Sequence, residues 1–264
     1  MLLIFNLLQS GYYTTEPVAS RYDAATMGMF VLIIVIGVIG YIVQARLQHV
    51  FKKYSEVPFP GGLTGAEVAE KMLRDNKIHN VKITHVSGQL TDHFNPQTMT
   101  VNLSDSVYAS RSVAAAAVAA HECGHAVQHA TKYSFLQLRS NLVPAVSFAS
   151  NVMPWILLAG IVLLNIFPGL LLFGIGLYAL TTLFSFVTLP VEINASQRAM
   201  AWLSNAGITY GQTTAQAKDA LKSAAYTYVV AALASLATLI YYIFIFLGLS
   251  LIHISEPTRP ISIS

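Results

Sequence analysis

The chain has 264 residues, of which 55% are hydrophobic and only 10% are charged, with a formal net charge of +3. A soluble domain normally has about 25% charged residues, so this composition excludes an ordinary soluble protein. The small net charge, without a basic patch interleaved with aromatic residues, excludes a nucleic-acid-binding protein. A single cysteine excludes an internal disulfide.

The first long apolar segment is 24–43, which follows an N-terminal segment of residues 1–23. Residues 24–43 contain no charged side chain and are long enough to cross about 30 Å of hydrocarbon as a helix. A secretory signal peptide fits less well, because residues 1–8 hold no basic residue. We therefore predict that 24–43 is the first transmembrane helix.

Residues 44–143 have the pattern of a small folded domain rather than that of a linker. Thr64 and Glu67 have the spacing of a capping box at the start of a helix. Residues 81–86 and 98–104 have the composition and alternation of β-strands. We expect 98–104 to be an edge strand. The domain is therefore predicted to be α+β.

The domain ends in an alanine-rich helix, predicted from about residue 111 to 131, that contains the sequence AAHECGHAVQHA. His121 and His125 are four residues apart, which on a helix is about 40° around the axis and about 6 Å along it. Both imidazoles can therefore reach one metal ion. Glu122 lies beside them and points elsewhere, toward a water molecule on the metal. This is the H-E-x-x-H arrangement of two zinc ligands and a general base; two structural core histidines are the alternative.

Two neighbours in this helix are poor candidates for the same metal. Cys123 points away from His121 and is predicted to pack as a small apolar residue. His129 is about 12 Å along the helix axis from His121, too far to share a metal with it, and a capping or interface role is expected.

Residues 144–189 predict a membrane hairpin, because two apolar segments flank a turn at Pro168 and Gly169. A second polar region, 190–225, follows the hairpin, and 226–248 is the fourth predicted transmembrane helix. The predicted spans contain no ionisable acidic, basic or histidine side chain. A transporter that passes metal along such groups is therefore disfavoured.

The two polar regions are separated by two predicted spans and must lie on the same side of the membrane. Ten of the fifteen Lys and Arg residues fall in 44–143 and three more fall in 190–225. The positive-inside rule then predicts that both regions face the cytoplasm.

A catalytic zinc needs a third protein ligand and one open coordination position. The carboxylates of the second polar region are Glu192 and Asp219. Glu192 stands where the third span leaves the membrane, and its helix has an apolar face that suits an inward carboxylate. A glutamate favoured by the dipole at a helix start is an equal alternative on residue type alone.

The order of these segments resembles that of the YugP-like neutral zinc metallopeptidases, which are bacterial membrane proteins related to the HtpX-like and CAAX-prenyl proteases. The resemblance extends from about residue 24 to 248 and includes LTDHFNP, LSDSVYASRS, AAHECGHAVQHA and LPVEINASQRA. It implies an α-helical protein of the bacterial plasma membrane with four transmembrane helices. A small α+β, gluzincin-like zinc peptidase domain is implied on the cytoplasmic face. It also implies that His121, His125 and Glu192 bind Zn²⁺, with Glu122 as the base.

Two residues depart from the related sequences. Asn194 and Ser196 stand where YugP-like and HtpX-like proteins, respectively, carry an aspartate. A carboxylate that orients a ligand histidine is therefore either missing or supplied from elsewhere, such as Asp92 or Asp105.

The function implied is hydrolysis of peptide bonds in membrane or cytoplasmic proteins. An extended substrate is expected to add to the edge strand 98–104, where Asn102 is a candidate contact. The candidates for the group that donates hydrogen bonds to the negatively charged carbonyl oxygen (the oxyanion) of the reaction intermediate are Tyr108, His93 and Arg198. The sequence does not decide among them. The alternative that is not an enzyme is a zinc-stabilised membrane scaffold, which would not need Glu122. The alternative enzyme is a prenyl-protein protease.

The last segment, 249–264, has a different origin in our interpretation. LSLIHISEPTR, residues 249–259, is similar to the in-frame translation of an adapter used in preparing sequencing libraries. We therefore assign no functional role to this segment.

Overall fold

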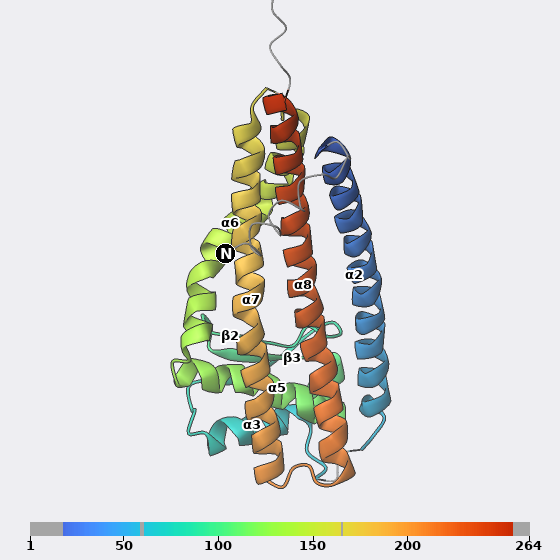
Figure 1. Cartoon of the computed structure of the whole chain (residues 1–264). Helices are drawn as coiled ribbons and strands as arrows, with labels where there is room; N and C mark the ends of the chain where they lie inside the picture. Colours follow the sequence, from blue (N-terminus) through green and yellow to red (C-terminus); the bar gives the residue numbers. More distant parts are fainter. Residues whose placement is uncertain (1–17, 59–60, 165, 256–264) are drawn as a thin grey trace, which may run out of the picture.

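Apolar segments that cross a bilayer must satisfy their backbone hydrogen bonds internally, and the apolar segments of this chain are helical. The computed structural model describes residues 18–58, 61–164 and 166–255. Four of the described helices are long and apolar enough to cross a membrane. Their bounds are α2 Val18–Ser55, α6 Ser134–Val162, α7 Pro168–Asn205 and α8 Gln212–Ser255. Figure 1 shows them standing side by side, with the sheet and the shorter helices gathered around one end.

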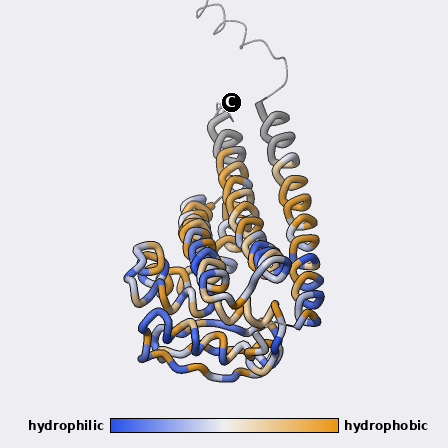
Figure 2. The backbone as a smooth tube through the Cα atoms, turned by 90° about the horizontal axis from the view of Figure 1, so that it is seen from below, coloured by the Kyte–Doolittle hydropathy of each residue, from blue (hydrophilic) through white to orange (hydrophobic). Residues whose placement is uncertain are grey.

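The surface of these helices is apolar, as a lipid environment requires. Tyr41, Trp155 and Val162 have exposed fractions of 77%, 72% and 73%. A contiguous apolar surface of this kind is not stable in water. Figure 2 shows the hydrophobic residues concentrated along the long helices, whereas the shorter elements carry most of the hydrophilic ones.

The long helices extend well beyond the predicted spans. Helix α7 continues through Pro190 into the second polar region, and α8 begins in that region before it enters the apolar segment. Helix α6 starts ten residues before Pro144 and keeps that proline inside it. A proline removes one backbone hydrogen bond, which here does not end the helix. Helix α8 also continues to Ser255, and residues 256–264 lie outside the described part of the chain.

The polar domain contains the remaining elements. They are α3 Gly65–Asp75, β1 Lys82–Val86, β2 His93–Asn95, β3 Thr100–Ser104, α4 Asp105–Tyr108 and α5 Val113–Ala130. The predicted capping box is present at the start of α3. The Thr64 hydroxyl oxygen accepts from the Glu67 backbone N–H at 3.2 Å, and the Glu67 carboxylate accepts from the Thr64 N–H at 2.7 Å.

The three strands form one sheet in the order β1-β3-β2, with β1 parallel and β2 antiparallel to β3. The prediction that 98–104 is an edge strand is therefore wrong, because β3 is the central strand. From the sequence, residues 93–97 were expected to form a turn, and β2, a strand of only three residues, was not predicted. Pairing with β3, with Phe94 opposite Val101, makes this short segment a strand.

Helix α5 is the centre of the polar domain, and fourteen of its eighteen residues are buried. It contacts α3, α7 and α8, among other elements. Its alanines allow neighbouring backbones to approach closely, and Gly124 allows the closest approach. A Cβ atom on Gly124 would lie 2.6 Å from the carbonyl oxygen of Ala195 on α7. Since Ala195 is one helical turn after Glu192, this contact brings Glu192 to the α5 histidines.

We predict that Gly124→Ala destabilises the protein and lowers its zinc content. Alanine favours a helix interior by about 1 kcal/mol over glycine. A methyl group against the Ala195 carbonyl must nevertheless push α5 and α7 apart, and overpacking of this kind typically costs about 1–3 kcal/mol. Thermal unfolding of the detergent-purified protein and zinc per protein measure the two effects.

Gly176→Ala, on the same helix as Ala195, is the matched control. Apart from the neighbouring backbone of its own helix, no atom of the described chain lies within 4 Å of a Cβ added at Gly176, so this variant should retain both stability and zinc. A Gly124→Ala protein as stable as the wild type, with full zinc, would contradict the role assigned to the close approach.

Candidate metal centre and cleft

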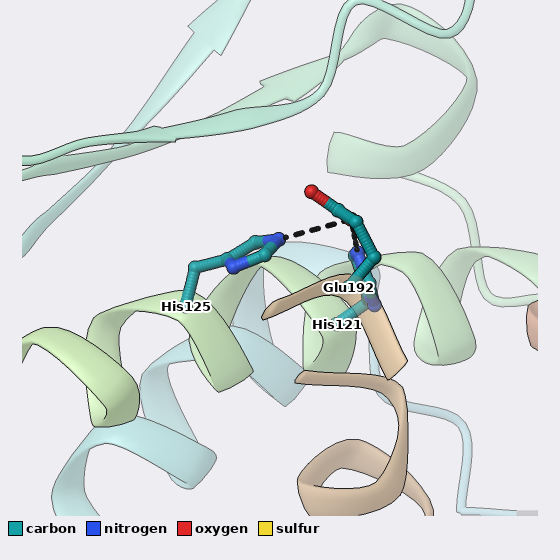
Figure 3. A group of neighbouring side chains, drawn as sticks. All are labelled: His121, His125 and Glu192. Carbon is teal, nitrogen blue, oxygen red and sulfur yellow. Dashed lines mark hydrogen bonds and ion pairs between the residues drawn. The ribbon is translucent and has the colours of Figure 1, made fainter. Parts of the chain in front are cut away.

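Two helices bring His121, His125 and Glu192 together, as shown in Figure 3. The histidines come from α5 and the glutamate from α7. Glu192 Oε2 lies 3.3 Å from Nε2 of His121 and 3.5 Å from Nε2 of His125. The three donor atoms all lie within 4.8 Å of one another. We call these three residues the His-His-Glu group.

The donors of this group fit zinc. Two imidazole nitrogens and one carboxylate oxygen are a ligand set found at catalytic zinc sites, where a fourth position stays open. Ligands about 2.0–2.1 Å from a tetrahedral zinc lie roughly 3.3–3.4 Å from one another. The separations from Glu192 Oε2 to the two imidazoles are close to this value.

Gln128 fixes which nitrogen of His125 carries the proton. The Gln128 amide nitrogen donates to the Val191 carbonyl at 2.7 Å and to the Asn194 side-chain oxygen at 3.0 Å. Its amide oxygen therefore faces Nδ1 of His125, at 3.0 Å. Because that oxygen can only accept, Nδ1 carries the hydrogen and Nε2 is left free to bind a metal.

His121 has a different neutral partner, since its Nδ1 lies 3.1 Å from the Ser196 hydroxyl. Asn194 and Ser196, the two departures from the related sequences, thus lie directly behind the histidines. Neither candidate carboxylate bonds to a ligand histidine: Asp92 lines the cleft but accepts hydrogen bonds from the Ser104 N–H and hydroxyl, and Asp105 is paired with His85. Of the two alternatives that the sequence left open, a missing carboxylate is the one that agrees with these contacts.

The protonation of His125 is set by competing effects. Burial works to lower its pKa, but the hydrogen bond to Glu192 and the charges of Glu122 and Glu192 outweigh burial, so the pKa of His125 is raised. A proton and a metal compete for Nε2 of this residue. Metal binding at this group therefore releases a proton and weakens as the pH falls.

Glu122 lies beside the His-His-Glu group without belonging to it. Its Oε2 accepts a hydrogen bond from the backbone N–H of Phe94 at 3.0 Å. Phe94 is on β2, and this N–H points away from β3, to which β2 is paired. The strand that the sequence did not predict therefore holds the carboxylate of Glu122.

A cleft of about 290 Å³ opens over these residues. Its lining includes Arg139 of α6 and Tyr228 of α8, neither of which was singled out as a site residue from the sequence. Nη1 of Arg139 lies 3.7 Å from Glu192 Oε1, the oxygen turned away from the histidines. The Arg139 Nε is buried without a hydrogen-bond partner among the described residues. The local sequence around Arg139 and Tyr228 carries no motif that would identify either as a site residue.

The candidates for oxyanion donors separate in space. His93 lines the cleft. Tyr108 instead packs against the ring of His85, and the Arg198 Nε donates to Asn194 at 2.8 Å. His93 is therefore the one candidate of the three that the structure brings to the cleft.

Asn102 does not line the cleft. Its side-chain oxygen accepts from the Thr84 hydroxyl at 2.6 Å, and its amide nitrogen donates to the Thr100 hydroxyl at 3.1 Å. The side chain of Asn102 is thus engaged within the sheet, and the structure does not bring it to the His-His-Glu group.

The other two polar residues of α5 lie as expected. Cys123 is fully buried in the core, and burial raises the pKa of its thiol. It packs as a small apolar residue, which confirms the prediction. His129 lines the cleft and lies against the ring of Phe94, with 5.8 Å between ring centroids, outside the His-His-Glu group.

Four helices that are long and apolar enough to cross a membrane, together with a His-His-Glu group that could hold a metal ion, are the features expected of a membrane metalloprotein. The model of the family described as "Putative neutral zinc metallopeptidase" matches residues 29–247, and the chain belongs to this family. The chain is also 41% identical over 205 residues to "Putative membrane protease YugP" of Bacillus subtilis (strain 168). That match covers 78% of this chain and 90% of the relative. No solved structure matches the chain.

We predict that Gln128→Leu weakens zinc binding by about 10–100-fold, the usual effect of removing a group that orients a ligand histidine. Leucine cannot accept the hydrogen of Nδ1, so His125 loses the partner that leaves Nε2 free. Competition with a chromophoric chelator measures the affinity. Gln97→Leu, at an exposed position outside the cleft, is the matched control. Equal affinities for Gln128→Leu and wild type would refute the tautomer argument.

Proposed function

We propose that the protein is a membrane-bound zinc endopeptidase with a gluzincin-like centre. In this proposal His121, His125 and Glu192 bind Zn²⁺, and Glu122 is the general base. The observation that carries it is the meeting of the three donors around one point, with Glu122 beside them at the floor of a cleft. Membership of a zinc metallopeptidase family supports the same assignment.

When bound, zinc supplies Lewis acidity toward a water molecule and toward the oxygen of the substrate carbonyl. The chain's own contribution is to hold Glu122 in place. The Phe94 N–H engages Oε2 of Glu122, which leaves Oε1 to accept the proton of the attacking water. Glu122 then passes that proton to the nitrogen of the departing amine.

Arg139 and Tyr228 are the donors that we assign to the negative charge that develops on the carbonyl oxygen. Both line the cleft beside the His-His-Glu group. Among the described residues, the guanidinium of Arg139 forms an ion pair with Glu192 Oε1, and its Nε has no hydrogen-bond partner. A preorganised cation in a partly dry cleft stabilises such a charge more strongly than water does.

We place the substrate backbone beside the outer edge of β2 rather than beside β3. The Phe94 N–H on that edge already donates to Glu122, so the Phe94 carbonyl is the group left for pairing. Strand β2 is bonded on one side only, and its other edge faces Glu122 and the cleft. Extended peptides commonly bind by adding to such an edge. Asn102 is not assigned to the substrate, because its side chain is engaged within the central strand region.

The membrane in question is the bacterial plasma membrane, with the polar domain and the cleft facing the cytoplasm. The clustering of Lys and Arg in the two polar regions supports this orientation. Substrates are then membrane proteins or cytoplasmic polypeptides. Lipid surrounds the exposed apolar surfaces of the long helices.

We expect Glu122→Gln to retain zinc and to lose peptidase activity by about 10²–10⁴-fold, the usual contribution of a general base. Glu192→Ala should lose zinc and activity together, because it removes one of three ligands. The assays are zinc per protein by mass spectrometry and casein cleavage by the detergent-purified full chain. Glu70→Gln, an isosteric change at an exposed position, should match the wild type.

Different outcomes separate the proposed enzyme from its alternative. Zinc bound by the wild type without cleavage of casein or of a mixed peptide library would favour the zinc-stabilised scaffold. Wild-type protein that binds no zinc would overturn both.

The orientation is tested with single cysteines and a membrane-impermeant maleimide on intact bacterial cells. The natural Cys123 is fully buried, so it should give little background. Ile166→Cys, in the exposed turn between α6 and α7, should be labelled from outside, whereas Gln97→Cys in the polar domain should require permeabilised cells. The reverse pattern would place the cleft outside the cytoplasm.

A further inference from the structure

A second cavity adjoins the cleft and extends in a different direction. The two cavities share Asp92, His121, Glu122 and Tyr228. From these shared residues the cleft runs toward α6, and the second cavity runs toward α2. Helices α6 and α2 stand on opposite flanks of the molecule in Figure 1. A bound chain could therefore continue on both sides of Glu122. We call the second cavity the side pocket.

The side pocket is apolar and small. Its apolar lining includes Leu47, Phe51, Leu90, Val118, Leu221 and Ala224. Its volume is about 130 Å³, slightly below the roughly 150 Å³ of a protein cavity that binds benzene. The space therefore suits one branched aliphatic or phenyl group.

The charges of the side pocket are confined to its junction with the cleft. Its ionisable lining groups are the four residues that the two cavities share. Of these, Asp92 has both carboxylate oxygens bonded to Ser104. No Lys or Arg of the described chain lines the side pocket, whereas Arg139 lines the cleft. The two directions away from Glu122 thus offer unlike chemistry.

Leu90 lines the side pocket and has an unusual backbone conformation. It lies between β1 and β2 with a φ of 57°, a conformation that is a genuine outlier for a bulky side chain. Leu90 is nevertheless 45% exposed, and it lines the side pocket. Strain of this kind is found at ligand-binding segments, where the fold holds a side chain in a required place.

We infer that the side pocket binds a bulky apolar side chain of the polypeptide next to the bond that is cleaved. The inference rests on the proposed peptidase function and names its substrate class. Glu122 borders both cavities, so a side chain in the pocket lies beside the reacting carbonyl or amine. The substrates are internal peptide bonds flanked by Leu, Ile, Met or Phe.

Two neighbouring alanines of α8 provide the test. Ala224 lines the side pocket, whereas Ala225 lines a separate groove between α7 and α8. Ala224→Leu fills the side pocket, and Ala225→Leu adds the same atoms outside it. The full chain is purified in detergent and incubated with a random-sequence peptide library, and the cleavage sites are mapped by mass spectrometry.

The wild type and Ala225→Leu should show Leu, Ile, Met or Phe enriched at one position flanking the cleaved bond. Ala224→Leu should shift that position to Gly, Ala or Ser, with the ratio of bulky to small residues changing about tenfold or more. Binding of an uncleaved Leu-containing peptide to the inactive Glu122→Gln variant should weaken similarly when Ala224→Leu is added. This binding readout does not depend on turnover.

Val118→Ala is a second variant that tests the same inference if Ala224→Leu does not fold. It enlarges the side pocket from α5, so it should shift the preference toward Trp and Tyr. Cleavage without a bulky apolar preference, or with a preference that neither variant changes, would overturn the inference and leave the peptidase function standing. No cleavage by the wild type, with no binding by Glu122→Gln, would overturn both.

Discussion

The close contact of α5 with α7 at Gly124 is the constraint on which the site depends. The His-His-Glu group joins residues 71 positions apart in the chain, with a membrane hairpin between them. Backbone contact at Gly124 and Ala195 brings α5 close enough for Glu192 to reach both histidines. The bonds from Gln128 to Val191 and from Ser196 to His121 cross the same contact. The absence of a side chain at Gly124 therefore allows the close approach that positions both the metal donors and the groups that orient them.

Features that depend on local sequence could be predicted. The four apolar segments follow from their length and composition. The capping box at Thr64 and the shared direction of His121 and His125 follow from the spacing of residues within α3 and within α5. The packing of Cys123 follows from its position on the opposite face of the same helix. Helix α5 began within two residues of the expected position, at Val113, because alanine-rich sequence and a serine cap leave little freedom.

Features that depend on tertiary contacts could not be predicted. Strand β2 is too short to have a pattern of its own, and only pairing with β3 makes it a strand. Arg139 and Tyr228 belong to long apolar helices whose rotation the sequence does not specify. Glu192 was equally compatible with a helix-start glutamate, and the family resemblance, not its residue type, identified it. Residues that converge from different helices carry no shared sequence signal.

The ligand histidines have neutral partners where related sequences carry a carboxylate, and there is a chemical reason why a neutral group suits this place. A glutamine side chain has a donor and an acceptor, and Gln128 uses the first on α7 and the second on His125. An aspartate could supply only the acceptor. The neutral partners Gln128, Asn194 and Ser196 therefore join the helices and orient the imidazoles without adding negative charge. The acidic and basic side chains that line the cleft, besides its histidines, are Asp92, Glu122, Glu192 and Arg139.

The position of Glu192 along α7 has a consequence for how substrates meet the site. The apolar segment predicted from the sequence ends at residue 189, and three further residues of helix rise only about 4.5 Å. In the proposed topology, Glu192 then lies in the headgroup layer of the bilayer. A membrane-anchored polypeptide can reach that layer by lateral diffusion alone. For such a polypeptide, encounter is a two-dimensional process, governed by the number of molecules per unit area of membrane and not by their concentration in solution.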